Sequence, residues 1–190
     1  AGFIGSNLVD RLVTEGFEVV VADNLSTGRA GQLNPEARFY NVDLDGDGLA
    51  AVLNEEKPEA ISHHAAQISV QASVRDPIRD ARINILGSLK LISLALNHGV
   101  QKFIYASSGG AIYGEPRYLP CDEGHPIAPI SPYGVSKYAV EMYLDVVRDT
   151  QRLDSTVLRY GNVYGPRQDP YGEAGVVAIF SERMLRGEQV

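Results

Sequence analysis

The chain has 190 residues, of which 44% are hydrophobic and 22% charged, and this composition fits one globular domain with a substantial core. Its formal net charge of -7 argues against nucleic acid as a partner. The sequence has no run of 18 apolar residues and no basic leader, so we expect neither a membrane span nor an export signal. The single cysteine, Cys121, excludes an internal disulfide, and the four histidines have no metal-ligand spacing. We therefore expect a cytoplasmic protein without a metal site.

Two glycines at the start of the chain lead into a predicted helix. Gly2 and Gly5 precede apolar residues that share one helical face, and residues 18–22 form a run of β formers that ends at Asp23. A glycine turn, a helix and a strand that ends in an acid are typical of the second part of a βαβ dinucleotide-binding unit. The strand that should precede Ala1 and one expected glycine are not in the sequence, so we expect a fragment.

The same stretch could hold a dinucleotide. A helix N-terminus presents unpaired N–H groups to a pyrophosphate, and glycines let the phosphate approach the backbone. Asp23 follows Gly5 at about the spacing at which a carboxylate reaches the adenosine ribose hydroxyls. Because such a carboxylate repels a 2′-phosphate, the pattern favours NAD over NADP. The alternative is a structural turn followed by a capping aspartate.

Strands and helices alternate along the rest of the chain. The predicted strands cover 38–42, 60–64, 102–106 and 155–159, and the predicted helices cover 49–56, 70–97, 132–150 and 176–186. We expect a break in the helix at 70–97 near Asp76-Pro77. This alternation predicts an α/β fold with a Rossmann-type doubly wound parallel sheet, whose first strand is missing. Residues 1–165 would form the NAD-binding domain, and 166–190 the start of a small substrate-binding region.

Two polar positions in these elements have alternative interpretations. Asp43 could accept a hydrogen bond from an adenine amino group, although a cap for the next helix is the favoured interpretation. Asn84 lies in an apolar helical stretch and needs a partner, such as a nearby loop or a water. Alternatively, Asn84 organises a catalytic water or loop behind an active site, and both interpretations stay open. The small residues Ala65 and Ala66 would let a flat ligand lie against the backbone.

Tyr133 and Lys137 are the strongest candidates for catalysis. Their spacing of four residues places both side chains on one face of the helix predicted at 132–150. A lysine ammonium could lower the pKa of the phenol by about 3 units, which corresponds to roughly 4 kcal/mol, and so produce a base near neutral pH. The alternative is a helix start in which Tyr133 packs and Lys137 is a solvated charge.

Two serines follow the strand predicted at 102–106. Ser107 and Ser108 would emerge at the carboxyl end of that strand, where open parallel sheets bind their ligands. Turn serines are common, so these two gain significance only from the tyrosine downstream. Which of the two hydroxyls is catalytic stays open.

Together these motifs resemble those of the NAD-dependent epimerase/dehydratase family, which belongs to the extended short-chain dehydrogenase/reductases. The segments that carry the resemblance span essentially the whole chain and are jointly specific. They are Gly2-Phe-Ile-Gly5-Ser, Asp23-Asn-Leu, His63-His-Ala-Ala66, Tyr105-Ala-Ser-Ser108, Pro132-Tyr-Gly-Val-Ser-Lys137 and Leu158-Arg-Tyr-Gly-Asn-Val-Tyr-Gly-Pro166.

The resemblance implies a role for each matching residue. Tyr133 would be the acid/base, Lys137 would orient the nicotinamide ribose and acidify Tyr133, and Ser108 would bind the reacting sugar oxygen. Asn162 would meet the diphosphate of the substrate. The residues expected to hold NAD are Gly2, Phe3, Ile4, Gly5, Asp23, Asn24, Asp43, Leu44, Ala65, Ala66, Asn84, Tyr133, Lys137 and Tyr160.

The resemblance also implies a reaction. Related dehydratases carry an Asp-Glu pair after the catalytic hydroxyl, whereas this chain has Gly109-Gly110 there, which favours an epimerase. The implied activity is interconversion of UDP-glucose and UDP-galactose at C4 through a 4-keto intermediate, in a homodimer that pairs the helices near 80–97 and 132–150. The alternatives are another nucleotide-sugar epimerase, dehydratase or reductase of the family, or a non-catalytic NAD or nucleotide-sugar sensor.

Overall fold

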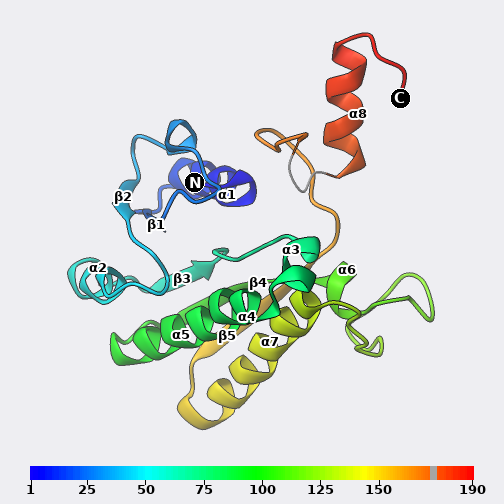
Figure 1. The fold of residues 1–190 in the computed structure, drawn as a ribbon. Helices are drawn as coiled ribbons and strands as arrows, with labels where there is room; N and C mark the ends of the chain where they lie inside the picture. Colours follow the sequence, from blue (N-terminus) through cyan, green and yellow to red (C-terminus); the bar gives the residue numbers. More distant parts are fainter. Residues whose placement is uncertain (172–174) are drawn as a thin grey trace. The chain divides into compact units, whose positions relative to one another are not determined.

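The computed structural model describes residues 1–171 and 175–190 (Figure 1). The chain divides into two compact units, one formed by residues 1–43 and 162–190 and the other by residues 44–161. Within the described ranges, no helix combines the length and the apolar character that crossing a bilayer requires.

The first unit contains a two-stranded parallel sheet. Val20 pairs with Arg38 at its start, and the chain leaves the first helix at Gly16, whose φ of 85° lies in the left-handed region that glycine tolerates. The predicted strands and helices of this unit are confirmed, with ends that differ by one or two residues. The elements are α1 (Phe3–Thr14), β1 (Val20–Asp23), η1 (Ala30–Gln32), β2 (Arg38–Asn41) and α8 (Val176–Leu185).

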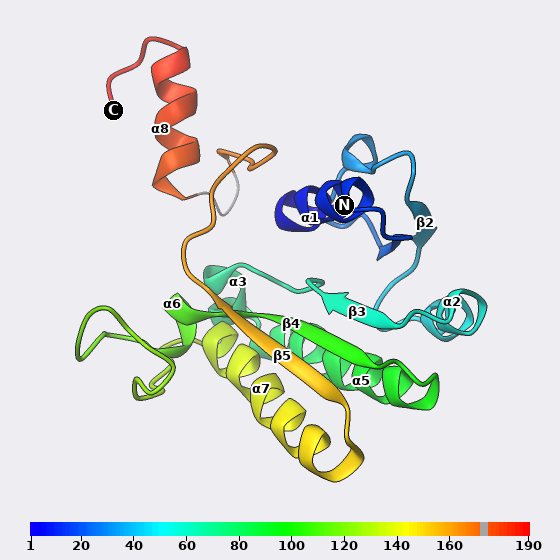
Figure 2. The same cartoon turned by 180° about the vertical axis from the view of Figure 1, so that it is seen from behind.

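The second unit contains a three-stranded parallel sheet in the order β3-β4-β5. Figures 1 and 2 show that helices α5 and α7 cover one face of this sheet. Its strands are β3 (Ala60–His63), β4 (Lys102–Ser108) and β5 (Asp154–Tyr160). Its helices are α2 (Gly48–Glu56), α3 (Val70–Arg75), α4 (Pro77–Ala81), the π-helical segment η2 (Arg82–Gly87), α5 (Ser88–Asn97), α6 (Gly109–Ile112) and α7 (Pro132–Gln151).

The described strands therefore form two sheets and not one. Dinucleotide-binding folds commonly have the strand order 3-2-1-4-5-6. If strand 1 is removed from that order, a group of two strands (3-2) and a group of three (4-5-6) remain. These groups correspond to the two sheets of this chain, β2-β1 and β3-β4-β5. The strand order thus agrees with a Rossmann-type sheet whose first strand is not among the described residues.

The helix predicted at 70–97 consists of four consecutive segments. The expected break occurs at Asp76, whose carboxylate accepts from the Arg79 N–H at 2.9 Å, and Pro77 opens the next segment. The π-helical segment that follows was not predicted, because single-turn insertions of this kind leave no period in the sequence. This segment carries Asn84, and it ends at Gly87, where an added Cβ would lie 2.6 Å from the Leu44 side chain.

The core of the second unit lies between the sheet and α7. Phe103 of β4 and both Val140 and Leu144 of α7 are fully buried. Helix α7 begins at the N-cap Ser131, whose hydroxyl accepts from the Gly134 N–H at 3.2 Å, and Pro132 occupies its first turn. Several charged or titratable side chains are buried in the same unit, namely His63, Asp80, Lys137 and Glu141. Since burying such groups is costly, they mark the region where a functional site is expected.

Candidate active site

Helix α7 places Tyr133 and Lys137 on one face, as the spacing predicts. The Lys137 side chain is buried, and its Nζ donates to the Ala106 carbonyl of β4 at 2.9 Å. The same Nζ lies 5.0 Å from the ring centroid of Tyr105 and 5.9 Å from that of Tyr133. The alternative of a solvated lysine is therefore wrong, because the Lys137 amine is buried against the carboxyl-terminal part of β4.

The structure separates the two serines at the end of β4. The Ser108 hydroxyl accepts from the Ala111 N–H at 3.3 Å, and its interaction with the Tyr133 side chain lowers the pKa of Tyr133. Ser107, the preceding residue, donates to the Glu141 carboxylate on another side of the strand. Successive side chains of a strand point to opposite faces, so only one of the two can reach the tyrosine. That residue is Ser108.

The expectation that Tyr133 has a lowered pKa is wrong for this structure. Burial raises the pKa of Tyr133, the nearby Asp80 carboxylate raises it further, and the hydrogen bond with Ser108 lowers it. The Lys137 amine is directed at the Ala106 carbonyl, and burial lowers the pKa of Lys137 to about 8 against the opposing influence of Asp80. The sequence reveals the pairing of phenol and amine but not the cost of burying the phenolate.

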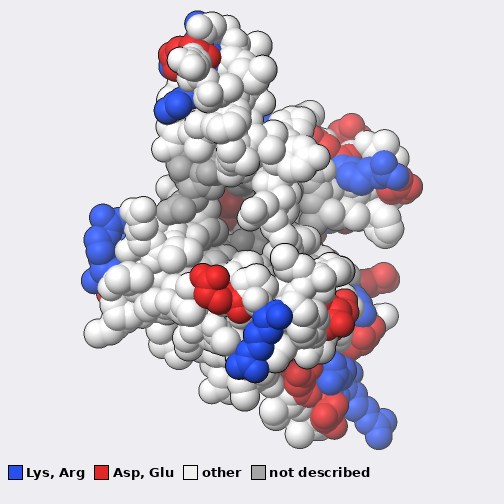
Figure 3. All heavy atoms as spheres, turned by 90° about the vertical axis from the view of Figure 1, so that its right-hand side faces the viewer, with Lys and Arg blue, Asp and Glu red and all other residues white. Residues whose placement is uncertain are grey.

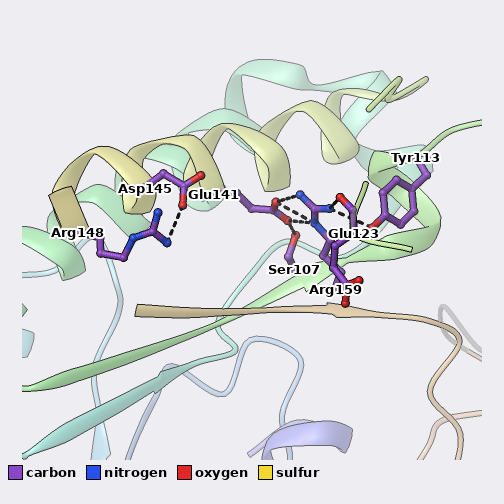
Figure 4. A network of polar contacts seen from close by, with 7 residues as sticks. All are labelled: Ser107, Tyr113, Glu123, Glu141, Asp145, Arg148 and Arg159. Carbon is purple, nitrogen blue, oxygen red and sulfur yellow. Dashed lines mark hydrogen bonds and ion pairs between the residues drawn. The ribbon is translucent and has the colours of Figure 1, made fainter. Parts of the chain in front are cut away.

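An ion pair between the partly exposed Arg159 and the buried Glu141 holds Ser107 at the end of β4 (Figure 4). The Arg159 guanidinium of β5 donates to Glu141 Oε2 through Nη2 at 2.7 Å and through Nε at 3.0 Å. Glu141 accepts the Ser107 hydroxyl, and Arg159 also donates to the Tyr113 hydroxyl at 3.0 Å. The resulting network joins β4, β5 and α7. Hydrogen bonding to Glu141 raises the pKa of Arg159 above its usual range.

A second buried carboxylate, Asp80 of α4, lies 1% exposed on the other side of this site. Its Oδ2 accepts from the Ser136 hydroxyl at 2.6 Å, while Oδ1 accepts from the side-chain amides of Gln67 at 2.8 Å and Asn84 at 3.0 Å. Sequence reasoning missed Asp80 and Glu141. Two signals were available, because Glu141 continues the four-residue spacing of Tyr133 and Lys137, and Asp80 precedes Asn84 by four.

Asn84 contacts the loop that follows β3. Its Oδ1 accepts from the Gln67 N–H at 2.8 Å, and its amide nitrogen donates to the Gln67 carbonyl at 2.9 Å and to Asp80. The contact agrees with both interpretations, since each of them places Asn84 against a loop. Since both amide hydrogens are used within the chain, we expect Asn84 to order this loop and not to bind NAD directly.

The remaining candidates of the second unit lie at the carboxyl ends of β3 and β5. Ala65 and Ala66 follow β3, and Tyr160 ends β5 with its ring stacked on His64 at 6.0 Å between centroids. The Tyr160 hydroxyl lies 3.2 Å from His64 Nε2. Together with Ser108, Tyr133 and Lys137, these residues follow the rule that ligands bind at the carboxyl ends of parallel strands.

The first unit carries the residues predicted for the adenosine and pyrophosphate side. Gly2 is the N-cap of α1 without a side-chain cap, and the first turn of α1, which includes Phe3 and Ile4, contains no acid. Added Cβ atoms at Gly2 and Gly5 would meet nothing within 4 Å, so the backbone there is open to approach. An uncapped helix N-terminus of this kind suits a phosphate.

Asp23, Asn24 and Asp43 form a polar cluster at the ends of β1 and β2. Asp23 accepts from the Leu25 N–H at 2.7 Å and from the Ala1 nitrogen at 3.0 Å, and Asp43 accepts from the Asn24 amide at 2.7 Å. The favoured interpretation of Asp43 as a helix cap is wrong, because Asp47 occupies the N-cap of α2. The residues present therefore fit an adenosine ribose and a pyrophosphate. Asn162 belongs to this unit as well.

The sequence matches the model of the "NAD dependent epimerase/dehydratase family" over residues 1–190. The chain belongs to this family. The family match, the parallel sheets and the similar solved structures confirm the predicted fold class. The description of the family confirms NAD as the cofactor with which its members work.

Solved structures of family members superpose closely on the whole chain. A UDP-glucose 4-epimerase from Thermotoga maritima, solved with UDP-glucose, is 54% identical with a TM-score of 0.96. One from Thermus thermophilus, solved with NAD, is 50% identical with a TM-score of 0.94. Both alignments cover 100% of this chain and 62% of the other.

Among curated family members, the UDP-glucose 4-epimerase of Mycolicibacterium smegmatis is 49% identical over 192 residues. This alignment covers 98% of the chain and 61% of that protein. The chain thus spans about three fifths of the length of the relatives it matches.

Proposed function

We propose that the protein to which this chain belongs is an NAD-dependent epimerase that interconverts UDP-glucose and UDP-galactose at C4. The observation that carries the proposal is the buried Lys137 amine, which donates to the Ala106 carbonyl at 2.9 Å and lies 5.9 Å from the ring centroid of Tyr133, with Ser108 at the end of the same strand. Such an arrangement suits removal and return of a hydroxyl proton. The names of the relatives described above support the choice of substrate.

Each of the three residues has a distinct task in the proposed reaction. Tyr133 removes the proton of the C4 hydroxyl and later returns it, and Ser108 donates to or accepts from the same oxygen and holds it beside Tyr133. Lys137 donates one hydrogen bond to Ala106, so its remaining N–H groups can bind a ribose hydroxyl. Gly109 and Gly110 follow Ser108 and provide no acid or base that could eliminate water, which supports epimerisation over dehydration.

NAD, when bound, supplies the hydride acceptor for C4. The chain contributes Gly2 to Gly5 at the start of α1 for the pyrophosphate and the cluster of Asp23, Asn24 and Asp43 for the adenosine. Leu44, Ala65, Ala66 and Tyr160 would bind along the rest of the cofactor, and Asn162 would meet the diphosphate of the substrate. The carboxylate of Asp23 accounts for a preference for NAD over NADP, because it would repel a 2′-phosphate.

A homodimer and a cytoplasmic location complete the proposal. Apolar side chains along α4, η2 and α7 are more than half exposed, and they include Ile78, Leu86, Val135, Met142 and Val146. A groove of about 550 Å³ lies beside them and is lined by Pro77, Ile85 and Ile130 among others. A second copy of the protein would cover this apolar surface. Sedimentation of the full-length protein would test this, and we expect the mass of a dimer.

The charged side chains are not gathered by sign. On the face drawn in Figure 3, basic and acidic side chains of the described residues are interspersed.

The Tyr133→Phe substitution tests the proposed function most simply. We expect the full-length variant to convert UDP-galactose at least 100-fold more slowly than the wild type, because the proton acceptor is lost. NAD binding, measured by fluorescence quenching or calorimetry, should stay intact, since the ring is kept. A variant that interconverts the two sugars at the wild-type rate would contradict the assignment of Tyr133.

Wild-type protein assayed on a panel of UDP-hexoses, UDP-N-acetylhexosamines and UDP-uronic acids identifies the sugar. Preference for UDP-glucose and UDP-galactose is the expected result. Preference for another sugar would keep the mechanism and change the substrate, whereas NAD binding without any turnover would indicate a sensor.

A further inference from the structure

Asp80 is a buried acid to which the proposed reaction assigns no task. Its carboxylate accepts three hydrogen bonds from three segments of the chain: the loop after β3, the π-helical segment and helix α7. The donor from α7 is Ser136, which lies between Tyr133 and Lys137 in the sequence. Asp80 therefore ties the helix that carries the acid/base to the elements behind it.

The three donors are neutral groups, one hydroxyl and two amides. They satisfy the oxygens of the carboxylate but do not cancel its negative charge. Glu141 differs, because the Arg159 guanidinium lies within 2.7 Å of its Oε2. In an interior of low dielectric, an uncancelled charge acts on other ionisable groups over several ångströms.

The groups on which the Asp80 charge acts are those of the proposed site. It raises the pKa of Tyr133 and opposes the lowering of the pKa of Lys137 by burial. The other titratable groups that interact electrostatically with these two come from β3, from the residue that follows it and from β4. They are His63, His64 and Tyr105.

We propose that Asp80 is an electrostatic positioning residue of this site, which holds α7 through Ser136 and whose charge sets the pH range in which Tyr133 and Lys137 work. The proposal rests on the proposed epimerase function of the full-length protein. Asp80 itself does not touch the substrate in this role; it acts through the other two side chains.

The sign of the effect follows from electrostatics. Removing a negative charge makes the phenolate of Tyr133 easier to form and the ammonium of Lys137 harder to keep, so both pKa values fall. If the two groups define the acidic and alkaline limbs of activity, both limbs move to lower pH. At an effective dielectric constant of about 20, a charge several ångströms away is worth roughly one pH unit.

The test is the pH dependence of kcat/KM for UDP-galactose in the full-length Asp80→Asn variant, with NAD saturating and the sugar varied below and above KM. We expect both limbs to shift by roughly one unit to lower pH, which means an about tenfold loss of activity on the alkaline side. Asp80→Glu, which keeps the charge, should keep both limbs in place and lower only kcat. Ser136→Ala should likewise leave the limbs where they are, because it removes a donor and not the charge.

Limbs that stay in place in a folded Asp80→Asn variant would overturn the proposal, as would an equal shift in Ser136→Ala. If Asp80→Asn does not fold, Asp80→Glu and Ser136→Ala carry the test, because a shifted limb in either one contradicts the proposal. Failure of the proposed function is distinguishable from both outcomes, since the wild-type protein would then show no turnover at any pH.

Discussion

Two buried carboxylates, Glu141 of helix α7 and Asp80 of α4, are held in different ways. Glu141 is paired with the Arg159 guanidinium and binds the hydroxyl of Ser107, whereas Asp80 is surrounded by neutral hydroxyl and amide donors. The charge of Glu141 raises the pKa of Tyr105, but it is not among the causes that shift the pKa of Tyr133 or Lys137. The charge of Asp80, which has no cation among its hydrogen-bond donors, shifts the pKa of Tyr133 and of Lys137. The difference separates a structural carboxylate from one that tunes chemistry.

The largest expected effect on stability comes from breaking the ion pair. Arg159→Met leaves the Glu141 carboxylate, which is 4% exposed, without its cation, and such a loss typically costs about 3–5 kcal/mol of the free energy of unfolding. The double variant Glu141→Gln with Arg159→Met removes both charges and should recover a large part of this cost. Urea unfolding of the three full-length proteins measures both values. An Arg159→Met variant as stable as the wild type would mean that Glu141 is not held by this pair.

The next largest effect on stability comes from removing the buried Lys137 amine, whose burial destabilises its charged form. Burial lowers the pKa of Lys137 from 10.5 to about 8, so the folded protein binds fewer protons than the unfolded chain between these values. The contribution of Lys137 therefore makes the wild type more stable as pH rises through this window, and at pH 7 the charged amine costs about 3 kcal/mol. Lys137→Met should be inactive, yet up to about that much more stable at pH 7.

The control for this variant is the dependence of stability on pH. Urea unfolding at pH 7 and pH 10 should show a stability gain for the wild type that is larger than the gain for Lys137→Met. Equal gains for the two proteins would mean that the Lys137 amine is not held in a low-dielectric environment.

The smallest effect separates the two serines. Ser107→Ala removes the hydroxyl that donates to Glu141 and should cost about 1–2 kcal/mol of stability, with little change in kcat. Ser108→Ala removes the hydroxyl that interacts with Tyr133, and we expect kcat to fall by about 100-fold. The same change removes the N-cap of α6 and should cost about 1 kcal/mol of stability. Thermal unfolding and steady-state kinetics of the two variants decide the assignment. The reverse pattern would assign the catalytic hydroxyl to Ser107.

Local patterns of the sequence predicted what local geometry determines. The four-residue spacing of Tyr133 and Lys137 places them on one helical face, and the break at Asp76-Pro77 follows from the chemistry of proline and the N-cap. The strands were found because the runs of β formers are continuous. These features need only a few neighbouring residues.

Contacts between distant residues were beyond the reach of the sequence. Asp80 meets Ser136 across 56 positions, and Ser107 meets Glu141 across 34. Asp43 was interpreted as a cap because a helix follows it, but its partner is Asn24 on another strand end. The direction of the Tyr133 pKa was wrong for the same reason, since burial arises from the whole fold and not from the neighbouring lysine.

The most direct test of the contrast between the two carboxylates is a titration of the Tyr133 phenol by NMR, with ¹³C placed at Cζ of tyrosine. Tyr133→Phe assigns the signal among the ten tyrosines of this chain and those of the remaining protein. We predict that Tyr133 titrates at lower pH in Asp80→Asn than in the wild type, and at the wild-type pH in the double variant Glu141→Gln with Arg159→Met. An unchanged titration in Asp80→Asn, or an equal shift in both variants, would contradict the account.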